Sequence, residues 1–450
     1  MRAKLSTMFQ SLRVRNYRIF ATGQLVKLLG VWMMHIAQDW LVLDLSDDSA
    51  TALGVVIALQ FTPVLFLTLL SGRLADRYDK RLLLIIANAA WCVLSVGMSL
   101  LVLTGVVEIW HVFLFAALLG VAQAVETPVR QAFVSELVPT PLLPNALSLS
   151  SATFNSARIV GPAVAGVGIA AFDVGPVFLI SALASLSPLV GLLRIRVADL
   201  YRDKRSAEAE QDSGRVIDGL RYVWRRQDLL LPLTLVLVLG LALFNFQLTL
   251  AALAKTKFNT AASSFGLFTT ALAIGALVGA LASGGRRSRP TAYRVIGAAF
   301  LFSSFSILVG LVPLYWLVIV LLVPTGFFMV YFVQAANQRV QLGTDSAFRG
   351  RVMALWVLVF LGTNPIGAPI IGWIAEHLGA GASIWLGGVV SFVTAALTLA
   401  WQLRHTGSRL RVQLRPHLRV SVTPEMWTER DTGGRELRDA IAPGVRDARL

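Results

Sequence analysis

Residues 72–84 read GRLADRYDKRLLL and connect two long apolar segments. Gly72 permits a tight turn and close helix approach because it has no side chain. Asp76 is placed to pair with an arginine or to cap a neighbouring helix at its N-terminus. Four basic residues lie in the stretch: Arg73, Arg77, Lys80 and Arg81. Because basic side chains favour the cytoplasmic side of a membrane, the stretch is predicted to be an ordered cytoplasmic loop between two spans.

Apolar segments like those two recur along the whole chain. Of its 450 residues, 56% are hydrophobic and 14% are charged, whereas a soluble domain carries about 25% charged residues. The blocks are roughly 20 residues long, the length of helix that crosses about 30 Å of hydrocarbon. This predicts an all-α membrane protein with twelve transmembrane helices, near residues 19–44, 52–71, 82–103, 110–128, 146–170, 175–194, 230–253, 264–284, 294–312, 314–337, 351–374 and 383–403.

The basic residues that give the net charge of +15 lie mainly in the predicted loops and in the tail. Lys and Arg gather after the second, eighth and tenth predicted segments, whereas the opposite loops carry mainly Asp and Glu. This positive-inside pattern predicts a multi-pass protein of the cell (inner) membrane with both termini cytoplasmic. The lipid bilayer is then the partner of most of the surface, and nucleic acid is not expected as a ligand. No small-residue cleavage site follows the first apolar segment, so we expect that segment to be the first transmembrane helix.

One long polar connection, residues 195–229, divides the chain. It contains DKRSAEAEQDSGR, which has no apolar face, and then the amphipathic stretch VIDGLRYVWRR, which predicts a short helix on the inner membrane surface. We therefore expect a six-helix half at residues 1–194, this linker, a second six-helix half at residues 230–403 and a polar cytoplasmic tail at residues 404–450. Matching glycines in the two halves favour parallel repeats, with substrate held between them near the midplane.

The order of residues in the 72–84 loop resembles the signature of the major facilitator superfamily, in which Gly is followed by Asp-Arg, a basic pair and an aliphatic run. The resemblance implies the major facilitator fold, with two six-helix pseudo-repeats. Asp79 stands where the family pattern usually has Gly, which leaves the turn geometry open. The counterpart in the second half, SGGRRSRPTAYR at residues 283–294, has no Asp, so a latch built on this motif would be one-sided.

A second motif, ARIVGPAVAG at residues 157–166, resembles the Gly-Pro motif of the drug and proton antiporters in this superfamily. Pro162 removes a backbone hydrogen bond and bends the helix, while Gly161 and Gly166 admit a neighbouring helix closely. A packing role alone is the alternative, because Pro and Gly are frequent in membrane helices. The resemblance implies export.

Longer stretches look like the branch that contains the enterobactin exporter and related secretion-type multidrug permeases. They are RNYRIFATGQL (residues 15–25), TPVRQAFVSELVP (127–139), NALSLSSATFNSARIVGP (145–162) and RGRVMALWVLVFLGTNPIGAPIIG (349–372). The resemblance implies secondary transport of a small molecule that is drug-, siderophore- or metabolite-like, and it names no cargo.

Arg158 is the most informative charge inside a predicted span. It lies about twelve residues into the fifth segment, roughly 18 Å along a helix, and therefore near the midplane. Ser151, Asn155 and Arg158 recur at spacings of three and four, so they share a helix face that should line the central path. The alternative is a structural arginine bound to carbonyls or a carboxylate at a helix contact, because a charge in hydrocarbon needs a partner.

Two carboxylates are candidates for proton coupling. Asp39 lies late in the first predicted span, where it is either a protonatable group facing the cavity or a solvated residue at the outer interface. Glu126 ends the fourth span, four residues before Arg130, and can pair with it across one helical turn. A gate or a stabilising pair is favoured over substrate contact for Glu126.

These observations predict a secondary transporter, not an enzyme, that exports a small amphipathic molecule in exchange for protons by alternating access. No metal site and no cofactor are expected, because no His/Cys cluster or Walker loop stands out. A monomer is expected. An uptake permease for a nutrient or siderophore is the first alternative, and a non-transporting membrane scaffold that uses the arginine-rich tail is the second.

Overall fold

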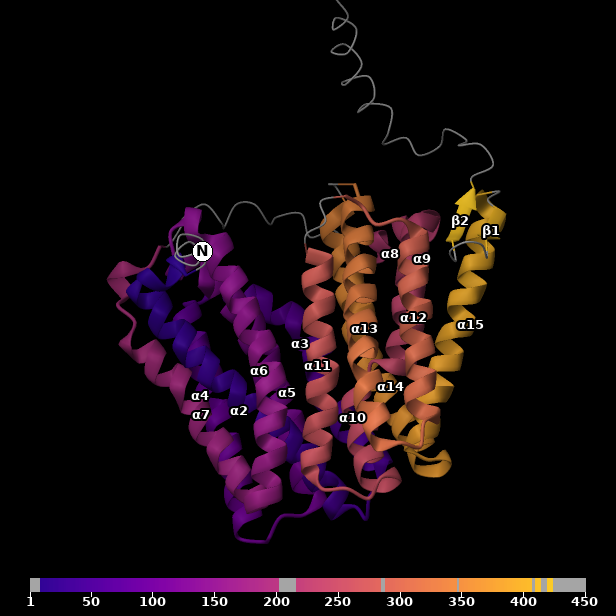
Figure 1. The fold of residues 1–450 in the computed structure, drawn as a ribbon. Coiled ribbons are helices and arrows are strands. Elements are labelled where there is room, and N and C mark those ends of the chain that lie inside the picture. Colours follow the sequence, from indigo (N-terminus) through magenta and orange to yellow (C-terminus); the bar gives the residue numbers. More distant parts are fainter. Residues whose placement is uncertain are drawn as a thin grey trace, which may run out of the picture. The chain divides into compact units, whose positions relative to one another are not determined.

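The computed structural model describes residues 9–201, 216–284, 288–345, 348–406, 409–413 and 419–423. Among these residues, twelve helices are long and apolar enough to cross a membrane, which confirms the predicted fold class. The helices before the long polar connection, drawn from indigo to magenta in Figure 1, run alongside one another. They are α2 (Arg15–Leu45), α3 (Ala50–Arg77), α4 (Lys80–Leu103), α5 (Ile109–Leu137), α6 (Leu143–Phe172) and α7 (Val174–Arg194).

The helices after that connection form a second set. They are α8 (Val216–Arg225), α9 (Gln227–Leu243), α10 (Phe246–Ala252), α11 (Ala262–Gly284), α12 (Ala292–Leu311), α13 (Tyr315–Gly343), α14 (Arg349–Leu378) and α15 (Ala380–Thr406). Three short 3-10 turns are η1 (Gln10–Arg13), η2 (Thr140–Leu142) and η3 (Val197–Asp199). We call α2–α7 the first half, and α9–α14 with the start of α15 the second half.

The seventh span is broken, although its sequence predicts one continuous segment. α9 ends at Leu243 and α10 begins at Phe246, and a π-helical turn, η5 (Leu253–Lys257), finishes the span. Asn245 lies at the break, and its buried amide nitrogen has no hydrogen-bond partner in the described part of the chain. Breaks and π turns of this kind often mark functional positions in helices.

Helix pairs from different halves pack closely. α3 packs against α14, and α6 packs against α11. Gly166 of α6 shows why small residues are needed there: a Cβ at this position would lie 2.9 Å from the Ala262 carbonyl oxygen of α11 and 3.1 Å from the Cα of Gly266. Close backbone approach at small residues is how membrane helices gain packing energy without a hydrophobic effect between them.

Residues 396–450 form a compact unit of their own. Its described part holds the end of α15 and two antiparallel strands, β1 (Arg409–Gln413) and β2 (Arg419–Thr423). Arg409 pairs with Thr423 and Gln413 with Arg419. The rest of the predicted tail lies outside the described residues.

Because each span reverses direction, the connections fall at two ends of the bundle. We call the end that carries residues 78–79, 195–201 and 288–291 the linker end. The end that carries residues 46–49, 104–108 and 258–261 is the opposite end.

Candidate transport path and gate

The polar face predicted on α6 becomes more buried from the linker end inward. Ser148 and Ser151 are exposed, Asn155 and Arg158 are half-buried, and Pro162 is buried. Asn155 donates to the Ser151 carbonyl oxygen over 2.8 Å, which fixes the amide on this face. Polar side chains with graded exposure are what a water-filled path narrowing from the linker end requires.

Arg158 lies beside the ring of Trp32 and, in the described part of the chain, not beside a carboxylate. Its guanidinium carbon is 5.7 Å from the ring centroid of Trp32 on α2, within the range of a cation–π contact. Among the described residues, Arg158 makes no hydrogen bond and no ion pair. Trp32 also makes edge contacts with His35 and Phe154, with ring centroids 5.9 Å apart in both cases. The site therefore combines one positive charge with a cluster of three rings, those of Trp32, His35 and Phe154.

Gly161 and Gly166, predicted to admit neighbouring helices, face different partners. A Cβ on Gly161 would lie 2.5 Å from the Cβ of Trp32, so Gly161 lets α6 approach α2 within the first half. Gly166 faces α11 of the second half. Pro162 lies between them, inside a helix that continues to Phe172. The Gly-Pro motif thus lies where α6 contacts α2 of its own half and α11 of the second half.

Glu126 belongs to a buried charge cluster within the first half. Its carboxylate is 3.1 Å from the Lys27 ammonium and 3.2 Å from Arg130. Lys27 also donates to Asn88 over 2.8 Å and lies 5.1 Å from the Trp91 ring centroid. Two cations thus share one carboxylate, and the contacts tie α2, α4 and α5 together.

Asp39 joins the two halves. It is 1% exposed, and its carboxylate accepts a 2.5 Å hydrogen bond from the side-chain nitrogen of Gln247 on α10. The alternative of a solvated residue at the outer interface therefore does not describe Asp39. Gln247 lies two residues after the break in the seventh span, so the break sets the position of this contact.

Further contacts between the halves lie near Asp39 at the opposite end. Lys255 pairs with Asp44 and, over 2.7 Å, with Asp48. The Glu376 carboxylate accepts from the Ser49 hydroxyl over 2.6 Å and from the Thr51 backbone nitrogen over 2.9 Å. We call these contacts, together with Asp39–Gln247, the opposite-end gate. They hold the halves together at this end of the bundle.

A cavity of about 750 Å³ adjoins the opposite-end gate. Both halves line it, and its charged lining residues are Asp47, Asp48, Lys257 and Glu376. Lys257 donates to the carbonyl oxygens of Gly310 and Val312 over 3.0 and 2.9 Å, which anchors it to the C-terminal end of α12. The cavity thus lies beside the opposite-end gate and is lined in part by charged groups.

The second part of the loop at residues 72–84 is held in place by side-chain contacts, which begin at Asp79. α3 ends at Arg77 and α4 begins at Lys80, and the Asp79 side chain accepts from the Leu82 nitrogen over 3.1 Å as the N-cap of α4. With φ at −59°, position 79 does not need glycine, which settles the turn geometry that the sequence left open. Arg77 is exposed. Gly72 and Asp76 belong to α3 but lie outside the residues whose side chains are described.

Lys80 and Arg81 connect this loop to other helices of the first half. Lys80 forms a 2.8 Å ion pair with Glu136 at the end of α5. Arg81 donates to the Leu192 carbonyl oxygen of α7 over 2.8 Å. The basic pair therefore ties three helix ends together at the linker end.

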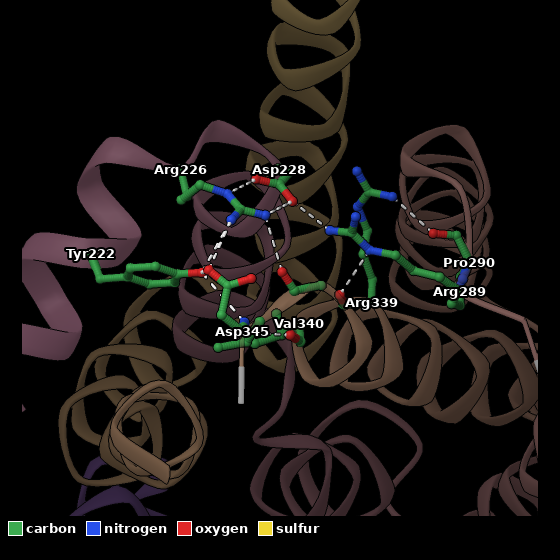
Figure 2. Close-up of polar contacts among 10 residues, drawn as sticks. Tyr222, Arg226, Asp228, Arg289, Pro290, Arg339, Val340 and Asp345 are labelled. Atoms are coloured by element: carbon green, nitrogen blue, oxygen red, sulfur yellow. Dashed lines mark hydrogen bonds and ion pairs between the residues drawn. The ribbon is translucent and has the colours of Figure 1, made fainter. Parts of the chain in front are cut away.

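A corresponding network in the second half is built around Asp228 (Figure 2). Arg226 contacts its carboxylate through two nitrogens, over 2.9 and 3.1 Å, and Arg289 contacts it over 2.6 Å. Arg289 belongs to the loop that lacks an acidic residue of its own, so α9 provides the carboxylate that the motif lacks. The hydrogen bonds to Asp228 raise the pKa of the Arg226 guanidinium above its ordinary value.

The same network includes the connection between α13 and α14. Arg226 donates to the Gly343 carbonyl oxygen over 3.1 Å, and the Tyr222 hydroxyl donates to Asp345 over 2.7 Å. Burial raises the pKa of Tyr222, so its hydroxyl stays protonated at neutral pH. Figure 2 shows Arg226 between Tyr222 and Asp228, with Arg289 approaching Asp228 from the other side. We call this set the linker-end network.

Sequence reasoning missed several of these partners. Trp32 and Phe154 have no polar signature, Lys27 is 61 residues from Asn88, and Gln247 is 208 residues from Asp39. The spacing of Trp32 and His35 at three residues on α2 was the one local signal for the cluster of three rings. Such contacts depend on tertiary packing.

With this geometry in place, comparison with known proteins identifies the class. Twelve helices long and apolar enough to cross a membrane, as found in the described part of the chain, are the architecture of the major facilitator superfamily. Residues 6–427 match the family described as transmembrane secretion effector, and the chain belongs to that family of major facilitator transporters. It is thus a multi-pass membrane transporter.

Individual relatives agree with this assignment. The chain is 25% identical to the staphyloferrin A transporter of Staphylococcus aureus, covering 89% of this chain and 99% of the relative. It is 21% identical to the enterobactin exporter EntS of Escherichia coli O1:K1, covering 85% and 91%. A solved POT family transporter in complex with a thioalcohol-conjugated peptide is similar in fold, with a TM-score of 0.69, 13% identity and coverage of 87% and 97%.

Proposed function

We propose that this chain is a secondary active transporter that exports a small anionic, amphipathic molecule across the cytoplasmic membrane in exchange for protons. The observation that carries the proposal is Arg158, a half-buried cation on a polar helix face, with Trp32 as its contact among the described residues. The named activity of one relative, export of enterobactin, supports the direction.

The charge of Arg158 favours an anionic cargo. A cation near the centre of a membrane costs about 2.5–3.5 kcal/mol, and a bound carboxylate or phenolate offsets that cost. Trp32 and Phe154 lie against the same site and suit an apolar or aromatic part of the molecule. Asn155 and Ser151 lie about one and two turns nearer the linker end, where a cargo entering from that end meets them first.

The contacts between the halves support alternating access. The opposite-end gate holds the halves together at one end, while the α6 face is exposed toward the other. The positive-inside pattern supports a cytoplasmic linker end and cytoplasmic termini. This arrangement supports a transporter that is open to the cytoplasm and that works as a monomer.

Asp39 is our first candidate for proton coupling. Its carboxylate accepts from Gln247 inside the gate, so a proton gained or lost there changes a contact that joins the halves. Glu126 is the second candidate, but its two cationic partners favour its charged form and therefore a stabilising role.

The first experiment identifies the cargo by comparing, without preselection, the solutes that cells retain with and without the gene. We expect the solutes that cells without the gene retain in larger amounts to be anions with an apolar part. Their uptake by inverted membrane vesicles then tests the direction, since an exporter accumulates them there and an uptake permease accumulates them in right-side-out vesicles. Accumulation in right-side-out vesicles alone would overturn export.

Arg158 variants test the class of cargo. Arg158→Gln should lose at least tenfold in transport of the anion, because one well-placed charge contact contributes about 1.5–3 kcal/mol. Arg158→Lys should keep part of it. Arg294→Gln removes an exposed charge at the start of α12 and serves as the control. Equal transport by Arg158→Gln and the wild type would contradict an anionic cargo.

A further inference from the structure

The short helix α8 has an exposed side that carries both apolar and basic side chains. Leu220 and Trp224, one turn apart, are 47% and 72% exposed. Arg221 and Arg225, also one turn apart, are exposed beside them. These four residues line a groove of about 300 Å³. Val223, in contrast, is 1% exposed.

The other side of α8 is attached to the second half. Tyr222 stacks on Phe348 with ring centroids 4.4 Å apart and donates to Asp345. One turn further on, Arg226 binds Asp228 and the Gly343 carbonyl oxygen. The helix is therefore fixed to the linker-end network by one side, and its apolar and basic side is left outside.

Chain connectivity places the end of α8 at the membrane surface. α8 ends at Arg225, and the membrane span that contains α9 begins at Gln227. A single residue, Arg226, separates them, so the Cα atoms of Arg225 and Gln227 are at most two steps of about 3.8 Å apart. The end of α8 therefore lies at the boundary of the bilayer, where tryptophan is favoured and where arginines meet lipid phosphates.

We propose that α8 is an anionic-lipid-binding element, in which Leu220 and Trp224 insert at the headgroup boundary and Arg221 and Arg225 bind the negatively charged headgroups. Basic side chains near an anionic surface are attracted to it. Because Tyr222 and Arg226 lie on the attached side, lipid bound to α8 holds the linker-end network in place. The proposal does not depend on the cargo or on the direction of transport.

Site-specific labelling tests the position of the helix. The chain has one cysteine, Cys92, so Cys92→Ser gives a background in which Trp224→Cys can carry a fluorescent label. In full-length protein in vesicles of phosphatidylcholine and phosphatidylglycerol, we expect quenching by spin-labelled lipid and little quenching by iodide. Ser288→Cys, in an exposed connection at the linker end, is the control and should show the reverse.

Two results would overturn the proposal at this stage. Strong iodide quenching at position 224, equal to that at position 288, would show that the groove faces water. Protection from both quenchers would show that another part of the chain covers the groove.

The charge requirement is tested by a second measurement on the full chain. Phosphatidylglycerol should raise the apparent Tm of the wild type above its value in phosphatidylcholine alone. Arg221→Gln with Arg225→Gln should lose most of that increase. Arg18→Gln with Arg294→Gln removes two exposed charges elsewhere at the linker end and should keep it. An equal loss in both double variants, or no lipid effect in the wild type, would contradict specific binding by α8.

Discussion

Glu126 illustrates how buried charges are compensated inside the first half. Its carboxylate is shared by Lys27 and Arg130, and both Lys27 and Glu126 are nearly inaccessible to solvent. Removing one member of a buried ion pair costs about 3–5 kcal/mol, because the remaining charge is left uncompensated. The two possible removals are not equivalent here, since the cluster holds two cations and one anion.

We predict that Glu126→Gln destabilises the protein more than Lys27→Met does. Glu126→Gln leaves two cations side by side, whereas Lys27→Met leaves the balanced pair of Glu126 and Arg130. The apparent Tm in detergent measures the difference. A Glu126→Gln protein with unchanged Tm and lost proton coupling would instead make Glu126 the proton carrier.

At the scale of helices, the α6–α11 contact is built from backbone. Gly166 and Gly266 meet there, and a Cβ on Gly266 would lie 2.6 Å from the Pro162 carbonyl oxygen. Backbone cannot move aside as a flexible side chain can. Overpacking of this kind costs about 1–3 kcal/mol, and each 1.4 kcal/mol changes an equilibrium tenfold.

Gly166→Val should therefore slow transport about tenfold or more, because the halves can no longer close on each other along α6 and α11. Gly97→Val is the matched control, since a Cβ at Gly97 on α4 would have nothing within 4 Å. Initial rates in proteoliposomes, normalised to the amount of folded protein, give the comparison. Equal rates for the two variants would contradict a functional contact at Gly166.

The linker-end network makes a second prediction at this scale. Asp228→Asn should lower the apparent Tm by the equivalent of about 1 kcal/mol, a modest loss because these ion pairs are partly exposed to solvent. Asp199→Asn, in an exposed turn at the same end, should leave the Tm unchanged. A Tm for Asp228→Asn within error of wild type would mean that the network does not stabilise the second half.

Sequence patterns predicted the helices better than the contacts between them. Long apolar blocks indicated twelve spans because hydrocarbon thickness fixes helix length. The break near Asn245 has no Pro or Gly signal at its own position, so the segment reads as continuous. Asp39 and Arg158 were identifiable because charges in hydrocarbon are costly, but Gln247 and Trp32 became partners only through packing.

At the scale of the whole molecule, the proposed alternating access requires the opposite-end gate to open when the path closes at the linker end. The gate is made of hydrogen bonds and ion pairs between the halves, and these exchange readily for bonds with water. Asp39 differs from the other gate carboxylates because it is buried, whereas Asp44 and Asp48 are exposed. Because solvent does not reach Asp39, we expect a proton bound there to change its contact with Gln247 directly.

The most direct test of proton-coupled export compares Asp39→Asn with Asp44→Asn in inverted vesicles under an imposed pH gradient, acid inside. Asparagine can still accept from Gln247 but cannot bind or release a proton, so Asp39→Asn should bind the cargo and exchange it for unlabelled cargo without responding to the gradient. The wild type and Asp44→Asn should both accumulate cargo in response to the gradient. Gradient-driven accumulation by Asp39→Asn at the wild-type level would contradict the account.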